Sequence, residues 1–268
     1  MREARSLVSL GLAGLVTFAA LSAGCSDGSA PDATTGTRVT LSLTVAAVPK
    51  TFTTKLGWDV TLTRALLATG AFYFFDGETL FARAPQPARR GPIELPWGIR
   101  PAYAHPGHYV PGNAKGEMLR GSSVDLLGPD TRLGDGTGVS GPFRSATFSF
   151  GSPVEGPLTA DLGGHLIVLE GTAKKGAETR AFRAGVDATD VLDGKKRPQI
   201  EGCPFKEAHV RSNGDVKLTV AVPAFFDQVE LELLPKGDTS TKLVDVPQSQ
   251  LVRSVRGADR YRFVWTAK

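Results

Sequence analysis

The residues of this chain best suited to chemistry are two histidines in the run His105-Pro-Gly-His108. Pro at the second position and Gly at the third are typical of a type II turn, because Pro fixes φ and Gly accepts the positive φ that follows. The ends of such a turn lie within about 7 Å of each other, so both imidazoles can reach one cation. The spacing predicts a transition-metal site here. The alternative is a purely structural turn.

Three further residues are candidates to complete the metal site. Glu117 and Met118 follow the turn, and His165 begins an apolar strand pattern. Met with His suits copper, whereas His with a carboxylate suits zinc or iron. We therefore expect copper, zinc or iron at His105 and His108, with Glu117, Met118 or His165 as additional ligands. For His165 the alternative is an ordinary residue at the end of a strand.

The turn lies in a long segment, about residues 84–143, that is rich in Pro and Gly and poor in strand-like alternation. Loops of this length in a compact domain are either functional or disordered. Trp97, Tyr103 and Tyr109 make this one more aromatic than a disordered linker, so we expect an ordered loop packed over the domain. These aromatic residues support an alternative function, in which a structural or adhesive protein contacts another protein or a glycan.

The elements that must position these residues are β-strands. Apolar and polar residues alternate in residues 39–45, 216–222 and 261–265, with the period of two that indicates a strand with one buried face. The pattern predicts an all-β fold, an antiparallel β-sandwich or sandwich-like barrel, as a single domain over residues 38–268. The core residues that we predict are Val39, Leu41, Trp58, Phe148, Val168, Leu218, Val220 and Phe263.

Several local features carry narrower predictions. Asn213-Gly214 is a type I′ turn signal and predicts a hairpin within residues 209–222. The alternation in residues 229–233 predicts a strand, and residues 62–68 have helical character. Cys203 is the only cysteine beyond Cys25 and has apolar neighbours, so we expect a buried core thiol and no disulfide.

The N-terminus has the layout of an export signal. Arg2 and Arg5 precede an uncharged apolar run over residues 7–21, and the small residues 22–24 stand directly before Cys25. The apolar run is shorter than the roughly 20 residues that span a bilayer. The segment resembles the signal peptide of bacterial lipoproteins, whose lipobox ends in a cysteine. The alternative is a plain secretory signal peptide.

That resemblance implies a signal peptide over residues 1–24 and acylation of Cys25 as the mature N-terminus. In that family an Asp after the cysteine retains the protein at the inner membrane, whereas Ser26 stands here. The resemblance therefore implies lipid attachment to the outer membrane, facing the periplasm or the cell surface. Residues 25–37 are small and polar, as in a flexible tether.

Charge and motifs argue against two other classes of protein, nucleic-acid-binding proteins and enzymes. The formal net charge is +4, and the basic residues are scattered rather than gathered in a stripe, so we expect no nucleic-acid partner. The chain contains neither a Gly-x-Ser-x-Gly elbow nor a His-Glu-x-x-His motif, so we expect no enzyme. We expect instead a protein that binds a small ligand, with a membrane transporter or another envelope protein as partner.

Overall fold

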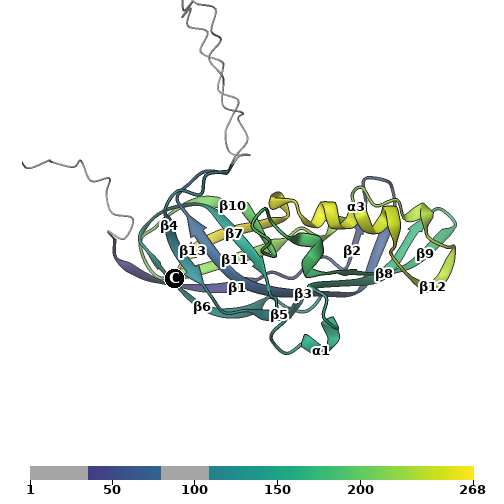
Figure 1. Ribbon diagram of the computed structural model, residues 1–268, viewed down its shortest axis with the longest axis horizontal. Coiled ribbons are helices and arrows are strands. Elements are labelled where there is room, and N and C mark those ends of the chain that lie inside the picture. Colours follow the sequence, from purple (N-terminus) through teal and green to yellow (C-terminus); the bar gives the residue numbers. More distant parts are fainter. Residues whose placement is uncertain (1–35, 80–108) are drawn as a thin grey trace, which may run out of the picture. The chain divides into compact units, whose positions relative to one another are not determined.

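The computed structural model describes residues 36–79 and 109–268, which are built mainly from β-strands (Figure 1). The strands are β1 (Arg38–Val45), β2 (Thr51–Thr53), β3 (Asp59–Phe75), β4 (Ala114–Met118), β5 (Ser122–Asp125), β6 (Thr131–Val139), β7 (Gly141–Phe150), β8 (Ile167–Lys175), β9 (Glu178–Val186), β10 (Gln199–Val210), β11 (Gly214–Val220), β12 (Gly237–Lys242) and β13 (Tyr261–Ala267). The helices are α1 (Thr159–Leu162), α2 (Val222–Phe225) and α3 (Asp245–Val255), with 3-10 turns η1 (Ala188–Val191), η2 (Leu231–Leu233) and η3 (Ala258–Arg260). Of the helices in these two ranges, none is long and apolar enough to cross a membrane.

The predicted all-β class is confirmed, and the strands form where apolar and polar residues alternate. In β11, Val216, Leu218 and Val220 are buried and the residues between them are exposed. All eight predicted core residues are buried, none with more than 5% of its surface exposed. Alternation therefore predicts correctly which face of these strands turns inward.

Eight of the described strands close into a ring. Their order is β3-β4-β6-β1-β11-β13-β10-β7, and β7 pairs back with β3. This is the barrel-like alternative of the predicted fold. The pairing is not purely antiparallel, because β1 with β11 and β10 with β13 run parallel, as do β9 and β12 outside the ring.

Strand β3 belongs to the ring and to a sheet that extends from it. Its first part, residues 59–67, pairs with β8, which continues through β9 to β12. Its last part, residues 72–75, lies in the ring between β4 and β7. Helix α3 runs along the extension (Figure 1), where Gln248 Nε2 donates to the carbonyl oxygen of Gly185 in β9 at 2.7 Å.

Aromatic side chains fill the ring. The centroid of the Phe74 ring lies 5.9 Å from that of Phe143, 5.6 Å from that of Phe205 and 5.7 Å from that of Phe263. All four side chains are buried. The inside of the ring is thus a packed core.

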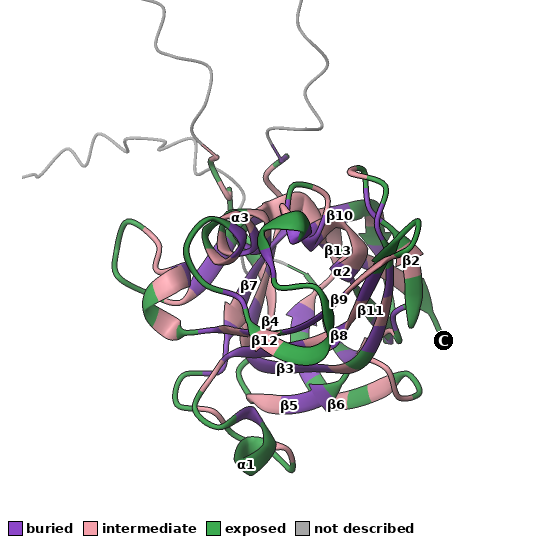
Figure 2. Cartoon of the chain, turned by 90° about the vertical axis from the view of Figure 1, so that its right-hand side faces the viewer, coloured by how far each residue is buried: buried purple, intermediate pink, exposed green. Residues whose placement is uncertain are grey.

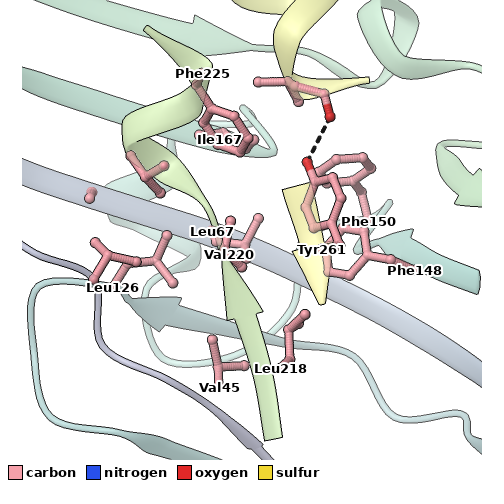
Figure 3. Close-up of a cluster of buried hydrophobic side chains, with 14 of the residues drawn as sticks. Val45, Leu67, Leu126, Phe148, Phe150, Ile167, Leu218, Val220, Phe225 and Tyr261 are labelled. Atoms are coloured by element: carbon pink, nitrogen blue, oxygen red, sulfur yellow. Dashed lines mark hydrogen bonds between the residues drawn. The ribbon is translucent and has the colours of Figure 1, made fainter. Parts of the chain in front are cut away.

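The ring and the extension share one hydrophobic cluster. Figure 3 shows Leu67 and Ile167, which pair across β3 and β8, in the same cluster as Val220 and Tyr261 of the ring. The Tyr261 hydroxyl donates to the carbonyl oxygen of Val255 at 3.0 Å and so joins β13 to the end of α3. The two parts are therefore packed as one body.

Glycines allow the ring to close between β4 and β6. Gly116 and Gly138 face each other in this pair. A Cβ atom on Gly136 would lie 2.4 Å from the carbonyl oxygen of Glu117, and one on Gly138 would lie 2.9 Å from that of Lys115. Side chains at these positions would therefore push the two strands apart.

The same glycines explain why the predicted loop over residues 84–143 is wrong in its second half. Residues 114–143 hold β4, β5, β6 and the start of β7. In β6 the apolar positions expected of a strand are taken by Gly134, Gly136 and Gly138, so the period of two is hidden. Gly is a turn signal in isolation, but here it is required by close strand approach.

The predicted hairpin at Asn213-Gly214 is also wrong. Strands β10 and β11 flank this turn but do not pair, because β13 lies between them. Asn213 Oδ1 instead accepts a hydrogen bond from the Thr40 backbone N–H at 2.8 Å. The insertion of β13 thus prevents β10 and β11 from pairing as a hairpin.

Two shorter predictions fail for a similar reason. Residues 62–68 lie inside β3 and are not helical. Residues 231–233 form the 3-10 turn η2 rather than a strand, and Leu233 is 56% exposed although alternation places it inside. Local pattern is overruled here by the surrounding packing.

Candidate functional site

Five of the predicted site residues lie outside the described residues. These are Cys25, Trp97, Tyr103, His105 and His108. The lipid attachment, the metal turn and two of the three aromatic contacts therefore remain predictions.

Glu117 and Met118 are neighbours in β4, so their side chains lie on opposite faces of the sheet. Met118 is 2% exposed and faces Phe72 in the pairing of β4 with β3. Its sulfur belongs to the core. The structure therefore does not bring Glu117 and Met118 together as ligands of one ion.

His165 lies just before β8 and is held by a carboxylate. Its Nδ1 is 2.5 Å from Asp187 Oδ1, and its side chain is 36% exposed. The imidazole lies against Gly185, where an added Cβ would be 2.8 Å from Nδ1 and 2.9 Å from Nε2. Within residues 36–79 and 109–268, no three His, Cys, Asp or Glu side chains are grouped closely enough to hold a metal.

Tyr109 is packed onto the ring. A Cβ on Gly202 would lie 3.2 Å from Tyr109 Cγ, so the phenol ring rests on this glycine. The Ser145 hydroxyl donates to the Gly77 carbonyl oxygen at 2.6 Å, so the Tyr109 hydroxyl, 2.7 Å away, donates to Ser145 Oγ. Burial raises the pKa of Tyr109 to about 12.

Hydrogen bonds also join the chain before residue 80 to the chain after residue 108. The Gly77 N–H donates to the Pro111 carbonyl oxygen at 2.8 Å. Asp76 Oδ1 accepts from the Asn113 backbone N–H at 2.7 Å, and Asp76 Oδ2 accepts from Asn113 Nδ2 at 3.1 Å. We call these contacts, with Tyr109 and Ser145, the rim clamp. These contacts hold residues 76–77 and residues 111–113 together at one place on the ring.

Cys203 is a buried core residue, as predicted. It is fully buried, and its Sγ donates to the Ile200 carbonyl oxygen at 3.4 Å. Burial raises the pKa of the thiol to about 12. The thiolate that metals and electrophiles require is therefore strongly disfavoured.

A depression of about 240 Å³ lies on the extension between α1 and β12. We call it the basic depression and define it by Arg64, His165, Arg183 and Lys242. Figure 2 shows α1 and β12 as mostly exposed elements beside the buried residues of the sheet. Val168 and Gly185 also line it.

Strand register places four charged residues in one row across this depression. Arg64 of β3 faces Glu170 of β8, Glu170 faces Arg183 of β9, and Arg183 faces Lys242 of β12. Residues that face each other in paired strands point to the same side of the sheet. The row is therefore a continuous charged strip on one surface.

The charges at the two ends of the row differ in their partners. The Arg64 guanidinium lies 2.8 Å from Asp161 Oδ1 and 3.4 Å from Glu170 Oε1. Neither Arg183 nor Lys242 forms an ion pair within the described part of the chain. Arg64 is thus paired with two carboxylates, one of which, Glu170, also faces Arg183. Arg183 and Lys242 are adjacent cations without an ion pair in the described residues.

No protein-family model, curated protein or solved structure matches this chain.

Sequence reasoning does not find the basic depression. Arg64, Glu170, Arg183 and Lys242 are far apart in the chain and belong to no motif. Only the pairing of four strands aligns them. Each of these charged residues interrupts an apolar strand pattern, which indicates only that it faces solvent. This signal is too weak to predict a binding site.

Proposed function

We propose that this protein is a lipid-anchored binding protein of the bacterial cell envelope, attached to the outer membrane through Cys25. Its ligand is a transition metal ion, copper, zinc or iron, bound by His105 and His108. A membrane transporter or another envelope protein would supply or receive the ion. The β domain serves as the platform for the histidine-bearing segment.

The rim clamp is the observation that supports this proposal. Asp76 and Gly77 are hydrogen-bonded to Pro111 and Asn113, so the described residues on either side of positions 80–108 lie together on the ring. Long chain segments with adjacent, fixed ends are frequently functional, because a rigid scaffold presents them. Tyr109, one of the three aromatic residues of the adhesive alternative, is packed against Gly202 as part of this scaffold.

Metal titration of the detergent-purified full-length protein tests the proposal. Isothermal titration with Cu²⁺ and Zn²⁺ should give one site that weakens as the pH falls below about 6.5, because protons compete for imidazole nitrogens. The His105→Ala/His108→Ala variant should lose this site. His209→Ala is the matched control, since His209 is an exposed histidine on β10. Equal affinity in the double variant would refute the metal site.

The anchor has a separate test. Cys25→Ser should give unprocessed precursor, because no other thiol stands at the cleavage position. Normal processing of this variant, with retention in the detergent-soluble membrane fraction, would refute the lipoprotein assignment. The metal site would be unaffected by that result.

A further inference from the structure

We propose that the basic depression binds a small ligand bearing a phosphate group, held between Arg183 and Lys242. This site is separate from the histidine turn of the proposed function.

Two like charges lie side by side in the depression. Arg183 and Lys242 face each other on the parallel strands β9 and β12, and both are exposed. Like charges directly opposite each other disfavour strand pairing. An oxyanion between them would replace this repulsion with two charge-assisted contacts.

The charges around this pair also favour an anion. Asp161 and Glu170 are the acidic residues that line the depression, and both contact Arg64. Their charge is therefore partly matched before any ligand binds. The lining as a whole, three cations against two carboxylates, keeps one net positive charge, and the two cations without ion pairs can each contact a different oxygen of one phosphate group.

The size of the depression limits the size of the ligand. A volume of about 240 Å³ lies below the roughly 300–1,000 Å³ of sites for drug-sized ligands, so the ligand is small. The imidazole of His165 forms one wall, fixed by Asp187 and by its contact with Gly185. The Arg183 guanidinium offers paired N–H donors for phosphate oxygens, and the Lys242 ammonium adds a point charge.

Isothermal titration of the detergent-purified full-length protein with inorganic phosphate and with glycerol phosphate tests this site. We expect binding that Arg183→Gln and Lys242→Gln each weaken at least tenfold, with loss of binding in the double variant. Arg211→Gln and Lys206→Gln are the matched controls, because both residues are exposed cations outside the extension. They should bind as the unchanged protein does.

Thermal unfolding provides an independent readout. Phosphate should raise the Tm of the unchanged protein and leave that of the double variant unaltered, because a ligand stabilises only the state that binds it. The double variant should fold, since both side chains are exposed. Without phosphate its Tm should equal or exceed that of the unchanged protein.

Two further arms identify the source of the phosphate and separate this proposal from the metal site. Binding to phosphatidylcholine vesicles that contain phosphatidic acid, without binding of the soluble esters, would assign the group to a lipid headgroup, provided that Arg183 and Lys242 are still required. His105→Ala/His108→Ala should retain phosphate binding. Phosphate binding that persists in the Arg183→Gln/Lys242→Gln variant, or its absence at millimolar concentration in every arm, would overturn the proposal.

Discussion

The closed ring and the sheet that extends from it share β3 but use their surfaces differently. The ring is filled by aromatic side chains, among them Phe74 and Phe263, and its seams are closed by glycines. The extension carries a row of charged residues on an open face, which ends in Arg183 and Lys242. Both parts share the hydrophobic cluster, but only the extension combines it with facing cations on its open surface, where the proposed ligand would bind. Substitutions inside the ring should therefore act mainly on stability, whereas those on the charged face of the extension should leave stability nearly unchanged.

The largest effect should come from the interior of the ring. Phe74→Ala removes a buried ring that touches Phe143, Phe205 and Phe263, and should lower the free energy of unfolding by about 3–5 kcal/mol. Urea unfolding followed by tryptophan fluorescence measures it. Leu119→Ala, at a side chain that is 62% exposed, should change stability by less than about 0.5 kcal/mol. Similar losses in both variants would show that the ring is not the main core.

A smaller loss is expected at the glycine seam. The Cβ atom of Gly136→Val would lie 2.4 Å from the carbonyl oxygen of Glu117, and such overpacking costs roughly 1–3 kcal/mol. Gly194→Ala is the control, because a Cβ there meets nothing within 4 Å. If urea unfolding shows no loss for Gly136→Val, β4 and β6 are not closely joined and the ring is open at this point.

The rim clamp should contribute less again. Tyr109→Phe removes the hydroxyl that donates to Ser145 and should cost about 0.5–1.5 kcal/mol. The pKa of Tyr109 is raised to about 12 in the folded protein, whereas an unfolded tyrosine ionises near pH 10. The unfolded chain therefore releases this proton first, and stability should fall as the pH rises above about 10. In urea unfolding between pH 8 and 11, Tyr109→Phe should show a shallower fall, and an identical slope would contradict the burial of this hydroxyl.

The smallest effect on stability belongs to the extension. Gly185→Ala places a Cβ within 3 Å of the His165 imidazole, whose partly exposed ring can turn away. Stability should change by less than about 0.5 kcal/mol, while the NMR signals of the His165 ring should shift as it leaves Asp187. Gly194→Ala is again the control, because a Cβ there meets nothing within 4 Å. Gly176 has equal space around it but a positive φ, which would strain an alanine. Unchanged His165 signals would show that the ring does not rest on Gly185.

Part of the fold follows directly from local sequence. The alternation in residues 214–220 predicts both the strand and its buried face, because side chains alternate between the two faces of a strand. The apolar neighbours of Cys203 predict its burial, because a free cysteine behaves as a small apolar residue. For the candidate site, sequence singles out His165 but neither its bond to Asp187 nor its contact with Gly185.

The sequence by itself determined the β class, the eight predicted core positions and, through residues 1–25, the resemblance to exported lipoproteins, because each of these depends on composition or short spacing. Only the tertiary structure decided which strands are neighbours. It placed β13 between β10 and β11 in spite of the Asn213-Gly214 signal, made strands of the glycine-rich residues 131–139, and aligned Arg183 with Lys242. These outcomes depend on close approach between residues far apart in the chain, and no local period records such contacts.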